Sequence, residues 1–309
     1  MKLSVPLIVA PMLRISGPDL VIASCNAGVV GAFPALNAAS GAELDNWLAR
    51  ISRNSEESGV PYAVNVIAHG SNRRLADDLS VIVSHRSPLV IASVGSPENV
   101  VAAVKGYGGT VYSDVVSIRH ARKAASIGVD GMVLLCAGAG GQTGWLNPFA
   151  FVEAVREFYD GALAVAGSIT HGRQLAALEL IGANFGYAGT AFIVANESMA
   201  TEDYRAAIVR AVADDVFATR ALTGIPTNVL RNSAAGVGIT DDTEWASPEQ
   251  KYDMRHIKLG KHVHSAGHGV GAVHREESCA AIVARFTEQY RVACAGEAAA
   301  APRVSRQGT

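Results

Sequence analysis

The sequence predicts a closed (β/α)8 barrel of the TIM-barrel class, followed by a smaller, mainly helical C-terminal region. Eight short apolar runs, rich in Val, Ile and Ala, alternate with segments of helical periodicity. Runs with little polar alternation are typical of strands buried on both faces, and strict β–α alternation implies a parallel sheet. Eight such repeats favour a closed barrel. The runs are Leu7–Met12, Val29–Ala35, Tyr62–Ile67, Leu89–Val94, Thr110–Val116, Gly131–Ala137, Ala162–Ile169 and Phe185–Thr190.

An open, doubly wound sheet is the alternative arrangement, because counting repeats cannot prove that a sheet closes. A dinucleotide-binding sheet of that kind needs a Gly-x-Gly-x-x-Gly sequence after its first strand. No such sequence follows Leu7–Met12. The barrel is therefore the favoured fold.

The segments between the runs carry helix signals of their own. In residues 43–54 the side chains of Leu44, Trp47, Leu48 and Ile51 share one helix face. Asn147 followed by proline is typical of a helix N-terminus, whereas Gly128 is a natural C-terminal stop. These signals predict helices between the second and third runs, between the fifth and sixth runs, and between the sixth and seventh runs.

The alternation stops after Thr190, which divides the chain into three parts. We expect residues 1–192 and 276–294 to form the barrel, and residues 193–275 to form a smaller substrate-covering region. Residues 201–212 have a helical pattern inside that region, and a final amphipathic helix is expected over residues 276–293. Residues 295–309 are small and polar enough to form a disordered tail.

Composition limits the partners and the cellular location. The 309 residues carry a net charge of −2, so nothing indicates binding to nucleic acid or to an anionic membrane surface. No apolar stretch is long enough to span a bilayer, and the first run does not extend to a signal-peptide pattern. No two of the four cysteines are close together in the sequence, as in a Cys-x-x-Cys motif, so we interpret them as reduced thiols. We expect a cytoplasmic protein, and a homodimer is one possible oligomeric state.

Two strand ends carry the residues of an anion site. The active site of a (β/α)8 barrel lies at the carboxyl ends of its strands, and the seventh and eighth loops usually bind phosphate. The seventh run contains Gly167 and Ser168, and the eighth ends in Gly189 and Thr190. Glycine lets backbone N–H groups approach an anion closely. The alternative is that these glycines only permit tight turns.

Three other strand ends supply candidates for contacts with a flat ligand. The sixth run leads into a loop with four glycines, where Gln142 can both donate and accept hydrogen bonds. Asn65 could bind the edge of a heterocycle, or be a satisfied buried amide. A flexible connection is the alternative for the glycine loop. The candidates are Ala10, Pro11, Met12, Asn65, Ala137, Gly138, Gly141 and Gln142.

Five of the nine histidines fall between His256 and His274. A metal site is one interpretation, but no His-Glu-x-x-His pattern is present, so we expect solvated or pocket-lining imidazoles and no metal. His268, or His264, could act as an acid or base near neutral pH. Neither a Gly-x-Ser-x-Gly elbow nor a P-loop occurs, so hydrolysis by a serine nucleophile and nucleoside triphosphate chemistry have no support.

Over about residues 5–290 the chain resembles the nitronate monooxygenases. The fragments VPLIVAPM, NAGVVGAF, YAVNV, GAGGQTG, VAGSIT, GYAGTAF and HSAGHGVGAV occur in the order seen in that family. The resemblance implies a non-covalently bound FMN and oxidation of alkyl nitronates by O2 to a carbonyl compound and nitrite. It also implies that the flavin phosphate binds at Gly167, Ser168, Gly189 and Thr190, and that Ser265 faces the cavity.

The chain departs from the family pattern at three positions. Gln142 stands where the family usually has a histidine, Asp114 where many members have a lysine, and Ala191 where an arginine is usual. An amide is too weak a base to take a proton from a neutral nitroalkane, so we expect activity on nitronates that are already ionised. A carboxylate at Asp114 would disfavour negative charge on a flavin.

Two other functions stay open at this point. Related flavin barrels use NAD(P)H to reduce a quinone or an enoyl thioester, and the sequence does not reveal the electron donor. A flavin-binding protein with little catalysis, or an enzyme that acts with a partner subunit, is the third alternative, which the replacement of the histidine slightly favours.

Overall fold

Eight parallel strands close into a barrel in the computed structural model, which describes residues 3–240, 252 and 262–296. The strands pair in chain order, and the last one returns to the first through Ile8 opposite Tyr187. Each strand lies inside one of the eight predicted runs, so the predicted barrel is confirmed. The barrel strands are β1 (Leu7–Val9), β2 (Val30–Pro34), β3 (Ala63–Ile67), β4 (Leu89–Ser93), β5 (Thr110–Val115), β6 (Gly131–Leu135), β8 (Ala162–Ala166) and β9 (Phe185–Ala188).

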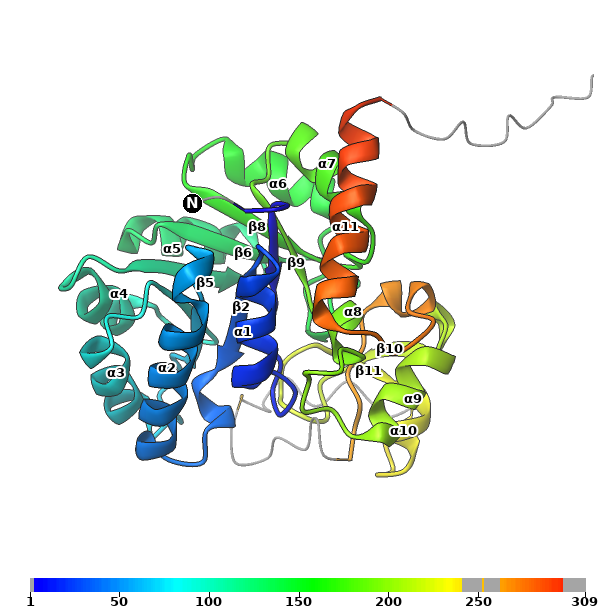
Figure 1. Ribbon diagram of the computed structural model, residues 1–309, viewed down its shortest axis with the longest axis horizontal. Coiled ribbons are helices and arrows are strands. Elements are labelled where there is room, and N and C mark those ends of the chain that lie inside the picture. Colours follow the sequence, from blue (N-terminus) through cyan, green and yellow to red (C-terminus); the bar gives the residue numbers. More distant parts are fainter. Residues whose placement is uncertain (1–2, 241–251, 253–261, 297–309) are drawn as a thin grey trace, which may run out of the picture.

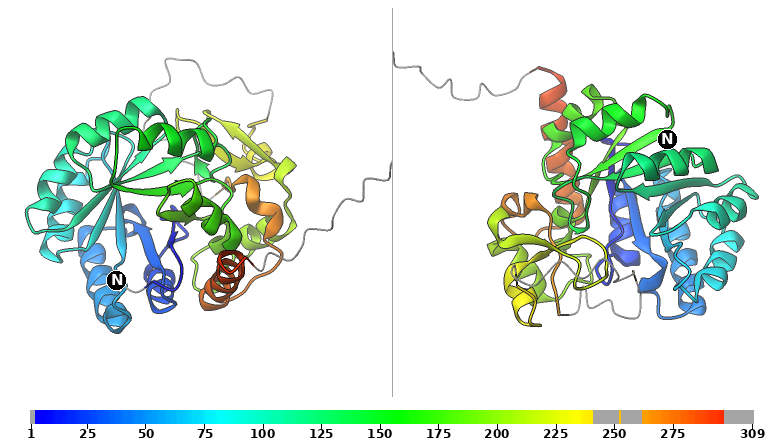
Figure 2. Two further views of the ribbon diagram at one scale, coloured as in Figure 1. Left: turned by 90° about the horizontal axis from the view of Figure 1, so that it is seen from above. Right: turned by 180° about the vertical axis from the view of Figure 1, so that it is seen from behind.

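Seven helices pack around the strands and form a ring when the barrel is seen from its end (Figure 2, left). Ser40 accepts a hydrogen bond from the Glu43 N–H at the start of the second helix, and Asn147 accepts one from the Ala150 N–H at the start of the sixth. The helices are α1 (Pro18–Asn26), α2 (Gly41–Ser55), α3 (Leu75–Ser84), α4 (Glu98–Lys105), α5 (Ile118–Ile127), α6 (Pro148–Arg156) and α7 (Gly172–Leu180).

The chain beyond β9 builds a smaller region beside the strand ends (Figure 1). The helix expected at residues 201–212 is present, but a β-hairpin that the sequence did not predict is present too. Its second strand pairs antiparallel with β7 (Gly141–Gln142), which is the glycine loop of the barrel. The elements are α8 (Thr190–Ile193), α9 (Glu202–Arg210), β10 (Val216–Thr219), β11 (Thr227–Leu230), α10 (Arg231–Ala235) and the short 3-10 helix η5 (His268–Ala272).

The final helix, α11 (Cys279–Cys294), completes the ring by packing on α7 and α1 (Figure 1). Phe286 is fully buried on this helix and stacks on Phe192, with ring centroids 6.1 Å apart. A Cβ at Gly172 would lie 2.1 Å from the Phe286 carbonyl oxygen, so only glycine permits this approach of α7 to α11. The expected final helix is therefore confirmed, and it takes the place of a barrel helix after β9.

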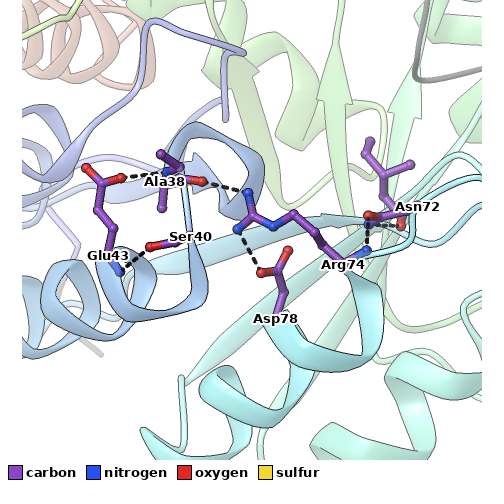
Figure 3. A network of polar contacts seen from close by, with 8 residues as sticks. Ala38, Ser40, Glu43, Asn72, Arg74 and Asp78 are labelled. Atoms are coloured by element: carbon purple, nitrogen blue, oxygen red, sulfur yellow. Dashed lines mark hydrogen bonds and ion pairs between the residues drawn. The ribbon is translucent and has the colours of Figure 1, made fainter.

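A polar network ties the loops that follow β2 and β3 (Figure 3). The Arg74 guanidinium donates to the Ala38 carbonyl at 2.7 Å and to Asp78 Oδ1 at 2.9 Å. Asn72 accepts from the Arg74 N–H at 3.1 Å and donates to the Ile67 carbonyl at 2.9 Å. Because Ile67 ends β3, these bonds hold the loop at the mouth of the barrel.

Within the described ranges, no helix has the length and apolar character needed to cross a membrane. The tail at residues 297–309 and His256 lie outside the described residues, so the expectations for them stay predictions.

Replacing Phe286 with Ala tests how much α11 stabilises the barrel. Removing a fully buried ring leaves a cavity against Phe192, so the free energy of unfolding should fall by about 3–5 kcal/mol. Urea unfolding followed by circular dichroism measures the change. Leu180→Ala is the control, since Leu180 is 89% exposed and its loss should change stability by no more than about 0.5 kcal/mol. Equal effects of the two changes would contradict this role of α11.

Candidate active site

One pocket opens at the carboxyl ends of the barrel strands, where the smaller region covers them. Its wall contains residues from β2, β3, β4, β5, β6, β8 and β9, together with the loop after β1, the glycine loop and the segment before η5. Twelve of the fifteen residues predicted for the site line it: Ala10, Pro11, Met12, Asn65, Asp114, Gly141, Gln142, Gly167, Ser168, Gly189, Thr190 and Ser265.

The other three predicted residues, Ala137, Gly138 and His268, lie beside the pocket wall. Ala137 is exposed, and so is His268. The Gly138 carbonyl accepts a hydrogen bond from the His268 N–H at 3.0 Å. A Cβ at Gly138 would come within 2.8 Å of Ser168 Oγ and 3.1 Å of His268 Nδ1. Gly138 and His268 therefore pack close to Ser168, in the loop after β8. Their roles in catalysis or cofactor binding stay predictions.

The loop after β8 has an unusual backbone that neighbouring side chains hold in place. Ser168 has a φ of 59°, a left-handed conformation that is uncommon outside glycine. The Gln174 amide donates to the Ser168 carbonyl at 2.9 Å and accepts from the Thr170 and His171 N–H groups at 2.8 and 2.9 Å. The strained turn is therefore stabilised from α7, as expected for a turn that serves a site.

Four backbone segments meet at this side of the pocket: residues 138–141, 167–170, 189–190 and 267–269. Thr190 Oγ1 accepts a hydrogen bond from the Gly267 N–H at 2.9 Å. A Cβ at Gly140 would lie 2.8 Å from the Gly267 nitrogen. The four segments therefore form a tight, glycine-rich cradle with backbone and hydroxyl donors, which suits a phosphate group.

The loop after β1 is held by a single amide. Asn37 donates to the carbonyls of Met12 and Ser16 at 2.9 and 2.8 Å and accepts from the Arg14 N–H at 2.6 Å. Ser16 Oγ in turn accepts from the Met12 N–H at 3.0 Å. The surface formed by residues 10–12 is therefore preorganised.

The floor of the pocket is a layer of polar side chains inside the barrel. Asn65, Ser93 and Asp114 stand on β3, β4 and β5 and form a hydrogen-bonded chain. Burial raises the pKa of Asp114 to about 7, although the hydrogen bond from Ser93 lowers it in part. Burial, with the nearby Asp114, also raises the pKa of Tyr187 well above its usual value.

The rim of the pocket presents Gln142 and Ser265, which both pair with β11, at Thr227 and Val229. Gln142 is held by the backbone pairing of β7 with Thr227, and its side-chain amide has no hydrogen-bond partner among the described residues. Ser265 is held through its backbone, because the Tyr204 hydroxyl donates to its carbonyl and accepts from its N–H, both at 2.7 Å. His264 stacks on Tyr204 with ring centroids 4.1 Å apart, and burial lowers its pKa.

Among the described lining residues no histidine, lysine or arginine occurs. The titratable lining groups are Asp114 and three tyrosines, Tyr187, Tyr204 and Tyr252. In the same ranges no three metal-ligating side chains come together. Among the described residues, a carboxyl at the floor is therefore the one lining group that could remove a proton from carbon near neutral pH.

Several lining residues were not predicted from the sequence. Ser93 is a polar residue at the carboxyl end of β4, and that position could have indicated it. Ile225 and Thr227 come from the hairpin whose pairing with β7 no local pattern reveals. Other missed lining residues are Ala139, Gly140, Thr170, Tyr187, Gly267 and Gly269.

Comparison with known proteins gives consistent relatives. A family model described as nitronate monooxygenase matches residues 36–289. The nitronate monooxygenase of Paraburkholderia phytofirmans is 26% identical over 276 residues, which cover 75% of each chain. A Mycobacterium tuberculosis protein, (3aS,4S,5R,7aS)-5-hydroxy-7a-methyl-1-oxo-octahydro-1H-indene-4-carboxyl-CoA dehydrogenase, is 26% identical over 229 residues, 73% of this chain. The present chain spans 63% of that dehydrogenase and 62% of its Rhodococcus jostii namesake.

Two solved structures share the fold. FabK from Thermotoga maritima superposes with a TM-score of 0.82 at 22% identity, and 96% of each chain is covered. Nitroalkane oxidase from Streptomyces ansochromogenes superposes with a TM-score of 0.77 at 21% identity, covering 96% of this chain and 98% of that one.

Replacing Tyr204 with Phe tests how the rim is held. The change removes the hydroxyl that satisfies the Ser265 backbone, so the free energy of unfolding should fall by about 1–3 kcal/mol. Urea unfolding measures this change, and hydrogen exchange at the Ser265 amide should become faster. Tyr290→Phe is the matched control, because its hydroxyl bonds Glu179 at the surface. Unchanged exchange at Ser265 in Tyr204→Phe would contradict the assigned contact.

Proposed function

The chain belongs to the nitronate monooxygenase family, and we propose that this flavin-dependent oxidoreductase binds FMN and oxidises alkyl nitronates with O2 to a carbonyl compound and nitrite. The observation that carries the proposal is a glycine-rich anion cradle joined to an apolar pocket, at whose rim the Gln142 amide has no hydrogen-bond partner among the described residues.

The residues present fit FMN in two respects. The cradle at Gly167, Ser168, Gly189 and Thr190 offers backbone and hydroxyl donors to a phosphate. The held surface at residues 10–12 and the polar floor at Asn65 and Asp114 suit an apolar ring face and a heterocycle edge. When bound, FMN supplies the acceptor for the electrons that a nitronate loses.

Gln142 determines which form of the substrate the pocket takes. Its amide N–H groups can donate to the oxygens of an anionic nitronate, but its oxygen is too weak a base to remove a proton from carbon. Apolar lining residues such as Met12, Ile67 and Ile225 bury an alkyl chain and exclude water. We therefore assign to this chain the oxidation of nitronates that are ionised before they bind.

Reduction of a quinone or an enoyl thioester with NAD(P)H is the second candidate function. It is favoured by the relatives named as dehydrogenases of a carboxyl-CoA compound, and it is compatible with a lining that holds no histidine or lysine among its described residues. The two functions differ in the electron donor, so the donor decides between them.

The first experiment mixes the purified yellow protein anaerobically with an alkyl nitronate that has been ionised beforehand, and separately with NADH and NADPH. Loss of the flavin absorbance with the nitronate alone is the expected result. Loss with a nicotinamide alone would move the assignment to the reductase. A colourless protein that takes up no added FMN would contradict both functions.

Replacing Gln142 with His should add proton abstraction to the pocket. An imidazole with a pKa near 6.5 can act as a base, so neutral nitroethane should become a substrate, with turnover rising as pH increases through that pKa. Nitrite release at several pH values measures the gain. Unchanged turnover of nitroethane would count against the assigned place of Gln142.

Gln142→Ala is the matched control for this substitution, because it removes the amide without adding a base. Loss of a hydrogen bond to an anion costs about 1.5–3 kcal/mol, so KM for a nitronate should rise roughly 10- to 100-fold. Turnover of neutral nitroethane should stay absent. A nitronate KM equal to that of the unmodified protein would show that the amide does not contact the substrate.

A further inference from the structure

Asp114 has a carboxyl oxygen without a partner at the floor of the pocket. Its side chain stands at the end of β5 and lines the pocket beside Asn65 and Ser93. The Oδ1 atom is buried and receives no hydrogen bond from the described residues. The Oδ2 atom is bonded to the Ser93 hydroxyl.

The direction of the hydrogen-bonded chain follows from its first member. Asn65 Nδ2 lies 3.0 Å from the Ile91 carbonyl oxygen, which can only accept, so the orientation of the amide is determined. The same nitrogen donates to Ser93 Oγ at 2.6 Å. Ser93 therefore has its single proton left for Asp114, and Asp114 Oδ2 is an acceptor.

Within the described part of the chain, no cation lines the pocket beside Asp114 to compensate a negative carboxylate. The facing groups are the neutral amide of Asn65 from β3, the Ser93 hydroxyl from β4 and apolar side chains from β6. Tyr187 from β9 is the titratable group that faces it among the described residues. An ionised Asp114 would leave a charged oxygen out of water with neither a donor nor a cation, which is costly.

We propose that Asp114 binds FMN as a neutral carboxylic acid, whose Oδ1–H donates a hydrogen bond to an acceptor on the pyrimidine side of the flavin ring. The inference rests on the proposed FMN site. It replaces the expectation, drawn from the sequence, that Asp114 is a carboxylate that disfavours negative charge on a flavin. A neutral donor would stand where many family members place a cationic one.

The proposal links FMN binding to one proton. Burial raises the pKa of Asp114 in the free protein to about 7, so below that pH the donor is present and affinity is constant. As pH rises above this value the proton must be taken up for binding, and affinity should fall by up to about tenfold per pH unit. Bound FMN should raise the pKa further, because it binds the protonated form.

The test measures the Kd for FMN by quenching of FMN fluorescence between about pH 6 and pH 9. In the unmodified protein the Kd should be constant and then weaken up to about tenfold per pH unit above about pH 7. Asp114→Asn keeps an N–H donor but cannot titrate, so its Kd should lack this dependence. Titration of the FMN phosphate is common to both proteins and cancels in the ratio of their Kd values.

Two further variants sharpen the result. Ser93→Ala removes the hydrogen bond that lowers the pKa of Asp114, so the change in Kd should begin at a higher pH. Asp160→Asn changes an exposed carboxylate and should keep the dependence of the unmodified protein. Infrared difference spectra should show a protonated carboxyl C=O band that shifts when FMN binds and is missing in Asp114→Asn.

A Kd that is constant over the whole range in the unmodified protein, or a dependence retained by Asp114→Asn, would overturn the inference. Failure to bind FMN at any pH would overturn it together with the proposed function. FMN binding with the expected dependence, but without oxidation of nitronates, would support the role of Asp114 and reject nitronate as the substrate.

Discussion

Closure of the parallel sheet is the constraint on which the rest of the structure depends. Pairing of β9 with β1, through Ile8 opposite Tyr187, brings the carboxyl ends of all eight strands to one mouth. Side chains as distant in the chain as Asn65 and Thr190 can then line one pocket. The final helix protects this closure, since α11 covers the ring beside α7 and α1.

The site divides into a side rich in donors and a side that is neutral. Backbone N–H groups and hydroxyls converge where Gly167, Ser168 and Thr190 meet the segment around Gly267. Across the floor, the side chains of Asn65, Ser93 and Asp114 are linked by hydrogen bonds, and none of the described lining residues is a cation. A polyanionic tail and an uncharged ring edge would be recognised by such a division, because each end meets partners of matching chemistry.

The smaller region does more than cover the pocket. By pairing β11 with β7 it holds the backbone of the glycine loop, and so sets where the Gln142 amide lies. The Tyr204 hydroxyl holds the Ser265 backbone, and His264 stacks on Tyr204. The positions of Gln142 and Ser265 therefore depend on contacts made outside the barrel, and a barrel core can present different rims when such contacts differ.

The sequence by itself determined the barrel and most of the residues predicted for the site. Apolar runs indicate strands that are buried on both faces, and glycines at strand ends indicate close approach of the backbone to a ligand. Twelve of the residues predicted from these signals line one pocket. Local patterns could not reveal the β7–β11 pairing, since a two-residue strand and a four-residue strand far apart in the chain carry little signal of their own. Nor could they reveal the raised pKa of Asp114. Its pKa depends on burial and on which neighbours reach each oxygen, and only the tertiary structure decides both.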